Sequence, residues 1–320
     1  MTGYRWQITP EIRTLLDEIN ALKIVVTKYP PQPEILESVR RRNLLKSAVY
    51  SARVEDIPAQ ITDPQVHRKI EIQNLLSAYS YVLSPRAPKK FSESLISGMH
   101  RKILKNISGS AGHYRSESWG IFNQAGIAVY LAPAHFHLPN LMPEYVRYTN
   151  QIQEPAPVIA AIAQFIFEKI HPFADGNGRV GRLISTYLLH RFGYGLKGLG
   201  IFEEYTDNNR EEYYRVLEPN NDCTPFIEYF LRSLVKSTQD SLSQLTSATP
   251  FRPEDYLLPR RREILAIIRD HPGCSFDFLS RRFSAVKPST LHYDLLQLLK
   301  ANLITKHGIT RAVVYSSASS

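Results

Sequence analysis

His171-Pro-Phe-Ala-Asp-Gly-Asn-Gly-Arg-Val-Gly-Arg182 is a polar stretch between two apolar segments. It contains one histidine, one acidic residue, three glycines and two arginines. The preceding residues, 155–170, are apolar, rich in alanine and open with prolines, which predicts a buried helix. Residues 179–192 predict a second helix. The polar stretch is therefore expected to be a loop held between two helices, and the first helix should end at His171 because a proline follows it.

Two other interpretations of this loop fail on their structural context. Residues 176–181 match the pattern GxGxxG, but a dinucleotide-binding fold needs a strand before the glycines, and here a buried helix precedes them. Residues 175–177, Asp-Gly-Asn, resemble part of a calcium-binding loop. Arg179 and Val180, however, stand where the next ligand and the turn glycine belong. A plain glycine-rich connection between helices would not explain the histidine and the two arginines.

The residue types instead indicate a cradle for an anion. Gly176 and Gly178 are expected to let the main chain turn sharply and present N–H groups. The helix that begins near Arg179 would add its positive N-terminus. Arg179 and Arg182 are three residues apart, so both could face the same anion with forked donors.

The loop also carries candidates for metal binding and proton transfer. Asp175 offers a hard oxygen ligand that suits Mg²⁺ bridging phosphates. His171 could accept a proton from an incoming hydroxyl when its imidazole is neutral. The residues therefore predict binding of a nucleoside polyphosphate with Mg²⁺, and attack on one phosphorus by an alcohol.

The stretch resembles the motif HxFx[DE]GNGRxxR of the Fic family (filamentation induced by cAMP) at every defined position. The resemblance extends over roughly residues 45–235. It implies a mainly helical fold and transfer of AMP from ATP to a Ser, Thr or Tyr hydroxyl of a protein, with self-modification included. It also implies roles for single residues: His171 is the general base, Asp175 the Mg²⁺ ligand, and the phosphates are held by Gly176, Asn177, Gly178, Arg179 and Arg182, with Arg182 at the γ-phosphate.

Two further segments acquire roles from the resemblance. Two β-prone runs around a glycine-containing turn predict a surface hairpin at about 119–131. The resemblance makes this hairpin a flap that clamps a target segment by strand addition, which a free edge allows. It also places Tyr214 and Asn221 at the pocket for the nucleotide base.

Ser51 and Glu55 lie four residues apart near the end of a predicted helix at 33–54. Spacing alone favours a solvated helix end. The segment 51–56, however, resembles the pattern [ST]xxxE[GN] of Fic proteins with an inhibitory helix. In those proteins the glutamate pairs with the second motif arginine, here Arg182, and displaces the γ-phosphate. Asp56 departs from the Gly or Asn of the pattern, which bears on the strength of inhibition. In some relatives the same glutamate helps to remove AMP from the modified target.

The domain organisation is predicted as three parts: an N-terminal helical region at 1–110 with the inhibitory helix near 45–56, a Fic core at 111–245, and a winged helix-turn-helix domain at 252–320 after a linker. Residues 252–320 contain 11 Lys and Arg and 6 Asp and Glu, so five of the nine excess positive charges of the chain lie there. Contact with DNA and contact with a protein, including a second copy of the chain, are both open for this domain.

Composition sets broad limits on the protein. The chain has 320 residues, 43% of them hydrophobic, and no apolar run long enough to cross a membrane. We expect no secretory signal, and the two cysteines without CxxC spacing suit a reducing, cytoplasmic compartment. The leading prediction is an AMP-transferase. The alternatives are a transferase with another donor (UTP, GTP or a CDP-alcohol) and a DNA-binding regulator whose Fic core only senses nucleotide.

Overall fold

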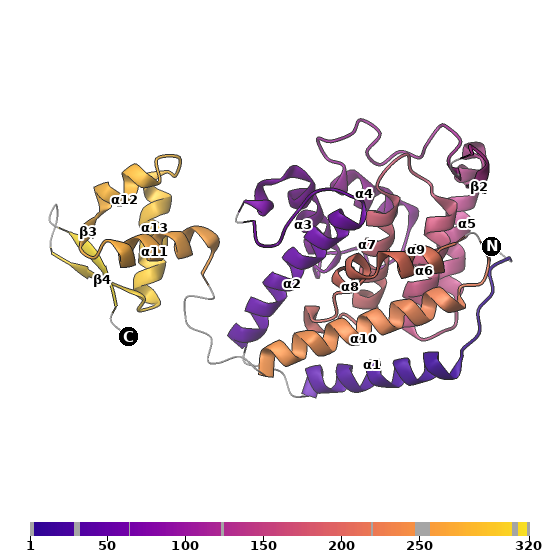
Figure 1. The fold of residues 1–320 in the computed structure, drawn as a ribbon, viewed down its shortest axis with the longest axis horizontal. Coiled ribbons are helices and arrows are strands. Elements are labelled where there is room, and N and C mark those ends of the chain that lie inside the picture. Colours follow the sequence, from indigo (N-terminus) through magenta and orange to yellow (C-terminus); the bar gives the residue numbers. More distant parts are fainter. Residues whose placement is uncertain are drawn as a thin grey trace. The chain divides into compact units, whose positions relative to one another are not determined.

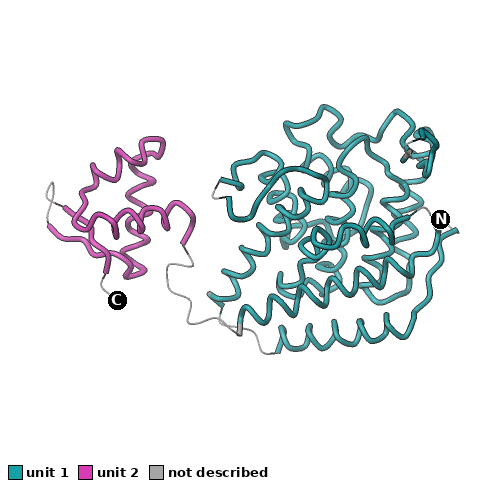
Figure 2. The backbone as a smooth tube through the Cα atoms, in the orientation of Figure 1, with its two compact units in different colours: residues 1–247 teal, residues 248–320 magenta. Residues whose placement is uncertain are grey.

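The computed structural model describes residues 3–28, 33–63, 65–122, 125–218, 220–246, 257–308 and 313–318. The chain divides into two compact units, residues 1–247 and 248–320 (Figure 2). The regions predicted as 1–110 and 111–245 lie together in the first unit. Most of the predicted linker falls outside the described residues.

The first unit is mainly helical, as predicted (Figure 1). Its helices are α1 (Pro10–Lys28), α2 (Pro33–Val54), α3 (Ile70–Val82), α4 (Glu93–Ile103), α5 (Leu138–Gln151), α6 (Ala156–Ile170), α7 (Asn177–Arg191), α8 (Glu203–Asn208), α9 (Arg210–Val216) and α10 (Thr224–Thr246), with 3-10 turns η1 (Val66–Arg68), η2 (His135–His137) and η3 (Leu196–Gly198). Lys69 is extended and separates η1 from α3. Among the helices described, none is long and apolar enough to cross a membrane.

Helices α6 and α7 form the centre of the first unit. Thirteen of the fifteen residues of α6 are buried, from Pro157 to Ile170, which is the pattern of a helix surrounded by others. Helix α7 packs along α6, and α1 runs beside α10 on the outside (Figure 1). The loop that joins α6 to α7 is therefore anchored at both ends in the apolar core.

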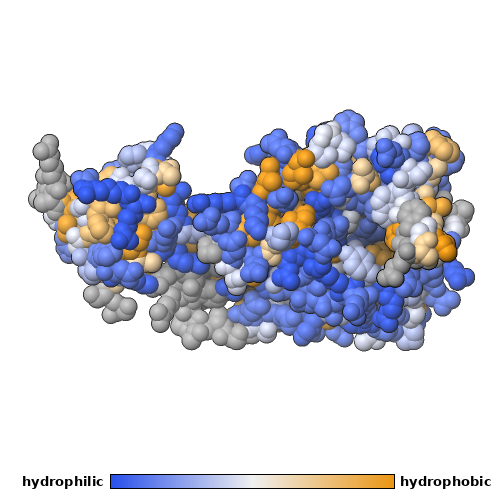
Figure 3. Space-filling model, turned by 45° about the horizontal axis from the view of Figure 1, so that its top comes forward, coloured by the Kyte–Doolittle hydropathy of each residue, from blue (hydrophilic) through white to orange (hydrophobic). Residues whose placement is uncertain are grey.

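The predicted hairpin is present on the surface of the first unit. Strands β1 (Gly120–Phe122) and β2 (Ala128–Leu131) pair antiparallel, with a bulge between Ile121 and Phe122. Hydrophobic residues gather at the right-hand end of this unit in Figure 3, the end where Figure 1 places β2. The hairpin exposes half or more of four apolar side chains: Ile121, Ile127, Val129 and Leu131.

The second unit has the order of elements that the sequence predicts for a winged helix. Its helices are α11 (Pro259–Asp270), α12 (Phe276–Arg282) and α13 (Pro288–Lys300), and its strands are β3 (Cys274–Ser275), β4 (Ile304–His307) and β5 (Val314–Ser317), in the sheet order β3-β5-β4. A separate apolar core joins the three helices to the sheet.

Asp294 joins two helices of this unit. Its carboxylate is buried on α13 and accepts hydrogen bonds from Arg260 and Arg261 of α11, at 2.5 and 2.8 Å. Burial alone would raise the pKa of Asp294, but the two guanidinium groups outweigh burial and lower it. Two arginines of the basic run at 260–262 therefore stabilise the unit, and a phosphate would have to compete with Asp294 for them.

Candidate active site

The loop between α6 and α7 depends on two residues with left-handed main chain. His171 follows the last turn of α6 at φ 49° and ψ 58°, and its N–H donates to the carbonyl of Phe167 at 2.9 Å. Gly176 has φ 77° and turns the chain into α7. Helix α7 begins at Asn177, two residues before the expected start near Arg179. Its first N–H groups, which have no partner within the helix, therefore belong to residues inside the motif.

Asn177 holds the loop closed with its side chain. Its amide nitrogen donates to the carbonyl of Phe173 at 2.8 Å, and its amide oxygen accepts the N–H of Phe173 at 2.9 Å. The residue is 2% exposed. Its side chain is therefore engaged within the loop, and its main-chain N–H is the group left to meet an anion.

His100 is a second support for the loop, and it was not predicted from the sequence. Its ring is buried and stacks on Phe173 with centroids 3.7 Å apart. Nδ1 accepts the N–H of Gly112 at 2.8 Å, so the proton lies on Nε2, which donates to the carbonyl of Asp175 at 3.0 Å. Burial lowers the pKa of His100 to about 4, which keeps the ring neutral in this bridge.

His171 is held in a state suited to accepting a proton. Its ring stacks on Trp119, with centroids 3.5 Å apart and planes 20° from parallel. Nδ1 lies 3.3 Å from the carbonyl of Glu168, so the proton belongs on Nδ1 and the lone pair on Nε2. Burial lowers the pKa of His171 to about 4, and the imidazole is therefore neutral at pH 7.

Arg115 connects the hairpin to the catalytic loop. Its Nε donates to the carbonyl of His171 at 2.8 Å. Its Nη1 and Nη2 donate to the carbonyls of Glu117 and Pro133, on either side of the hairpin. Arg115 is 6% exposed, so one buried guanidinium fixes the base of the hairpin to the main chain of the candidate base. This role of Arg115 was not predicted from the sequence.

The two motif arginines have different protein partners. Arg179 pairs with Asp175, four residues earlier, with Nη2 2.9 Å from Oδ1. The N–H of Gly176 donates to the same oxygen at 2.6 Å. Within the described ranges no hydrogen bond or ion pair falls on Oδ2 of Asp175, and this side chain is 62% exposed.

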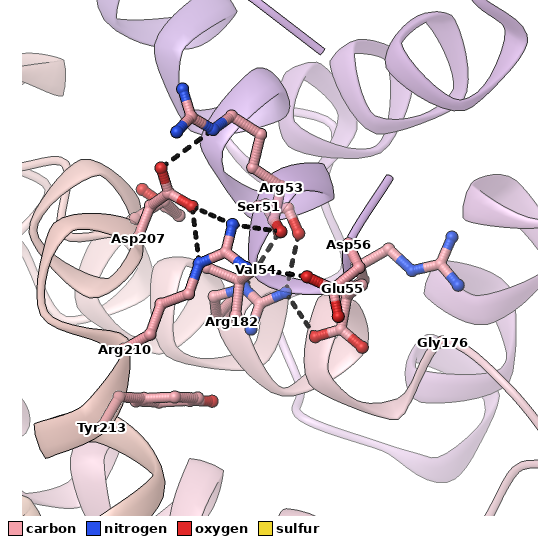
Figure 4. A network of polar contacts seen from close by, with 12 residues as sticks. Ser51, Arg53, Val54, Glu55, Asp56, Gly176, Arg182, Asp207, Arg210 and Tyr213 are labelled. Atoms are coloured by element: carbon pink, nitrogen blue, oxygen red, sulfur yellow. Dashed lines mark hydrogen bonds and ion pairs between the residues drawn. The ribbon is translucent and has the colours of Figure 1, made fainter. Parts of the chain in front are cut away.

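Arg182 is fully buried against the end of α2 (Figure 4). Its Nε donates to the hydroxyl of Ser51 at 3.0 Å, and its Nη2 donates to the carbonyl of Ser51 at 2.8 Å and to Oε1 of Glu55 at 2.9 Å. Burial works to lower the pKa of Arg182, but Glu55 raises it above its usual value. Ser51 is buried, so the solvated helix end that spacing alone favoured is wrong.

Gly178 contributes through its lack of a side chain and not through a turn. It lies inside the first turn of α7, and a Cβ atom there would stand 2.2 Å from Oε1 of Glu55 and 3.2 Å from Nη1 of Arg182. That Nη1 is buried without a hydrogen-bond partner among the described residues. The carboxylate of Glu55 therefore rests on the main chain at the start of α7, beside a donor that still lacks an acceptor.

A network of charges holds the end of α2 in place (Figure 4). Asp56 has φ 57°, a conformation that Gly and Asn favour and Asp tolerates. Its carboxylate pairs with Arg210 at 2.9 Å, and Arg210 also pairs with the buried carboxylate of Asp207 at 2.5 Å. Arg53 lies 3.0 Å from the other oxygen of Asp207. The Asp that departs from the family pattern therefore occupies a left-handed position, where Gly and Asn are the favoured residues.

The two residues expected at a base pocket lie in different surroundings. Tyr214 is 53% exposed, and its hydroxyl donates to the carbonyl of Val54 at the end of α2. Asn221 is exposed, and its carbonyl accepts the N–H of Arg5 at 2.9 Å. The structure therefore brings Tyr214 to the site, whereas the contacts of Asn221 within the described ranges join it to the N-terminal segment.

Comparison with known proteins agrees with this geometry. Residues 90–189 match the model of the Fic/DOC family. Two curated proteins, both named protein adenylyltransferase Fic and from Drosophila mojavensis and Drosophila melanogaster, are 30% identical over 158 residues. The match covers 48% of this chain but only 29% and 30% of these relatives.

Solved structures share the fold. A Fic family protein from Desulfovibrio desulfuricans G20 superimposes with a TM-score of 0.65 and 22% identity, over 98% of both chains. A Fic domain-containing signaling protein from Bacteroides thetaiotaomicron gives a TM-score of 0.60 and 19% identity, over 76% of this chain and 99% of that one. At these identities the likeness concerns the fold.

Proposed function

We propose, from the premise that residues 90–189 are a domain of the Fic/DOC family, that the chain is a self-inhibited protein adenylyltransferase. It would transfer AMP from ATP to a Ser, Thr or Tyr hydroxyl of a protein. The observation that carries the proposal is the position of the Glu55 carboxylate. It lies against Gly178 at the start of α7 and on Arg182, where an anion would meet N–H groups and a guanidinium together.

The proposed reaction needs one proton acceptor and a bound triphosphate. The hydroxyl oxygen of the target attacks the α-phosphorus of ATP, and the bond from that phosphorus to the bridging oxygen breaks, so that pyrophosphate leaves. The hydroxyl proton passes to Nε2 of His171, which is free to accept it because Nδ1 donates to Glu168. The loop contributes mainly by positioning and by stabilising charge.

The residues fit a magnesium ion that accompanies the nucleotide. Asp175 is exposed, and one of its oxygens lacks a hydrogen bond among the described residues. The described part of the chain contains no cluster of three or more His, Cys, Asp or Glu that could hold a metal alone. Mg²⁺ commonly takes one carboxylate, with phosphates and waters as its other ligands. When bound, the ion would neutralise charge on the phosphates, and Asp175 would hold it.

Self-inhibition follows from competition for Arg182. The pair between Glu55 and Arg182 uses donors that the γ-phosphate of ATP would need for productive binding. Because Arg182 is fully buried, its guanidinium requires an acceptor, and either the carboxylate or the phosphate can supply it. Glu55 would therefore allow nucleotide to bind only in an unproductive position. The same glutamate is a candidate for assisting removal of AMP.

The proposed target is a protein segment that pairs with the hairpin. The edge of β2 and the exposed apolar side chains Ile127, Val129 and Leu131 suit an extended peptide. The target includes the protein itself.

The second unit would contact DNA or a protein, including another copy of the chain. A cytoplasmic location is part of the proposal, and Cys223 and Cys274, both free and buried, support it.

Labelled ATP with Mg²⁺ tests the proposal. Glu55→Gly should raise labelling of the protein itself at least tenfold, and Glu55→Gln should raise it less, since the amide still fills the space. Adding His171→Ala to Glu55→Gly should abolish the label. A panel of UTP, GTP and CDP-alcohols separates the alternative donors. If the Glu55→Gly protein takes label from none of these nucleotides and instead binds its own promoter specifically, the regulator is the correct function.

A further inference from the structure

A cavity of about 650 Å³ lies beside the inhibitory helix, and no residue of the loop 171–182 lines it. Its walls come from α1, α2, α3, α7 and the segment around η3. This volume is typical of sites for small molecules or cofactors. The catalytic chemistry described above makes no use of it.

The walls of the cavity are apolar, and its charged residues are mostly cationic. Apolar side chains are supplied by four of its elements, among them Val26, Leu44, Leu83 and Leu189. Lys23, Arg40, Arg41 and Lys197 also line it, whereas Glu37 and Glu203 are the acidic residues of the lining. Glu37 already pairs with Arg40 and Arg41, at 3.5 and 3.0 Å. The lining therefore suits a molecule with an apolar body and one negative group.

The backbone beside the cavity is strained. Leu196, Lys197 and Gly198 have φ values of 44°, 51° and 80° in succession. Two of these three residues have side chains that disfavour the left-handed region. All three line the cavity. Such strain is retained where the surrounding structure needs the conformation, and here it shapes one wall.

The base of the cavity lies close to the inhibitory contact. Ser47 and Tyr79 line the cavity, and both donate to the buried carboxylate of Glu203, at 2.9 and 2.8 Å. Burial raises the pKa of Tyr79 far above its usual range, whereas the charge of Arg182 and the hydroxyl of Ser51 act in the opposite direction. Ser51 in turn accepts a hydrogen bond from Arg182. Tyr79 therefore connects the carboxylate of Glu203 in the cavity with the surroundings of Arg182.

One face of α2 carries residues of both the cavity and the inhibitory contact. Ser47, Ser51 and Glu55 follow one another at intervals of four residues, and side chains at that spacing share a face. Arg40, Arg41 and Leu44 of the same helix line the cavity. A ligand that touches α2 together with α1 and α3 would therefore favour the position of α2 in which Glu55 reaches Arg182.

We propose that this cavity is a regulatory site for a small amphipathic anion, with an aromatic or aliphatic body and one carboxylate, sulfonate or phosphate, and that its occupant stabilises the contact between Glu55 and Arg182. The ligand acts by binding one arrangement of α2 in preference to others. The proposed effect on activity rests on the proposed transferase function, whereas the proposed binding of a ligand in the cavity does not depend on it.

Calorimetric titration with 8-anilinonaphthalene-1-sulfonate tests the site, because this probe has an aromatic body and one negative charge. We expect saturable binding of one probe per chain. Ser80→Trp should weaken binding at least tenfold, whereas Ser77→Trp should not change it. Both serines are exposed on α3, but only Ser80 lines the cavity. Equal binding by these two variants, or no binding by the native protein, would overturn the site.

Two arginine substitutions give an independent check of the site. Arg40→Ala should weaken binding about threefold or more, and Arg42→Ala should have little effect, because Arg42 is exposed on the same helix but does not line the cavity. The same loss in both variants would show a diffuse attraction to positive charge and would overturn the assignment to this cavity.

Hydrogen exchange tests the connection to the inhibitory contact without any measurement of transferase activity. Saturating probe should slow exchange of the amides of residues 47–55 severalfold in the native protein and leave them unchanged in Ser80→Trp. If the probe binds but exchange in 47–55 stays the same, the regulatory part of the proposal is wrong. If these results hold while the Glu55→Gly protein takes no label, the transferase function fails and the ligand site stands.

Discussion

The Oε1 atom of Glu55 would lie 2.2 Å from a Cβ atom at position 178, where the chain has glycine. No carboxylate could approach the start of α7 this closely past a side chain. Gly178 has helical backbone, so its conformation does not require glycine. The close approach of the Glu55 carboxylate is what requires glycine at position 178. Any anion that replaces this carboxylate must occupy the same space.

Gly178→Ala should therefore disturb the inhibitory contact without activating the protein. The methyl group would push the Glu55 carboxylate away but would occupy the place of the phosphate. We expect self-labelling below one tenth of the Glu55→Gly level, and no recovery in the double variant. Gly98→Ala on α4 is the control, because a Cβ atom there meets nothing within 4 Å. Labelling by Gly178→Ala as strong as that by Glu55→Gly would contradict this account.

Ser51→Ala should lower stability and partly release inhibition. The change leaves Nε of the buried Arg182 without its acceptor, which costs about 1–3 kcal/mol of unfolding free energy. Labelling should rise less than in Glu55→Gly, because the carbonyl of Ser51 still accepts from Nη2. Urea unfolding measures the first effect, with the exposed Ser77→Ala as control. An unfolding free energy equal to that of the native protein would show that the hydroxyl is not needed.

The pH profile of labelling should reflect the burial of His171. In the Glu55→Gly background we expect a constant rate between pH 7.5 and 5.5, and a decline only toward pH 4, because burial lowers the pKa of the base to about 4. Trp119→Leu removes the ring that covers the imidazole, so it should move the acidic decline toward the ordinary histidine value near 6.5. A decline centred near pH 6.5 before that substitution would be inconsistent with a buried base.

Glu168→Gln should stabilise the protein in a pH-dependent manner. Burial, followed by repulsion from Glu55, raises the pKa of Glu168 to about 8, so the folded state retains a proton that the unfolded state loses above about 4.5. Stability from this group is present at low pH and is lost as pH rises from 4.5 through 8. The glutamine variant has no group at this position that ionises in this pH range. Urea unfolding measures the difference in unfolding free energy between the variant and the native protein. This difference should increase in favour of the variant by a few kcal/mol between pH 5 and pH 9. A constant difference would show that Glu168 is ionised throughout.

The continuous motif is the part of the site that the sequence predicts best. The motif is short and lies at the loop between α6 and α7. Its residues His171, Asp175 and Arg182 are close in the sequence, so few alternative positions in space are open to them. Spacing is less informative for the pair of arginines. It puts Arg179 and Arg182 where one anion could meet both, but Asp175 lies four residues before Arg179 and pairs with it. A local ion pair of this kind competes with a shared ligand, and spacing alone does not decide between them.

The supports of the loop could not be predicted because their contacts join distant parts of the chain. His100 reaches Asp175 across 75 residues, and Arg115 reaches His171 across 56. Each resembles an ordinary polar residue in its own segment, and only tertiary packing reveals its partner. Spacing alone leaves Ser51 at a solvated helix end for the same reason, because nothing local shows that Arg182 covers that face of α2. Only the resemblance to the family pattern assigned Ser51 a role.

The left-handed backbone at Asp56 has a further consequence for how inhibition can vary. This residue contacts no group of the proposed reaction, yet it sets where α2 ends and pairs with Arg210. Exchanging it for glycine would relieve backbone strain and remove the ion pair with Arg210, whereas asparagine would remove the ion pair but keep a side chain that tolerates this backbone. Under the proposed function, residue 56 is therefore a tuning position, through which mutation would raise or lower the resting activity of the protein while its nucleotide chemistry stays unchanged.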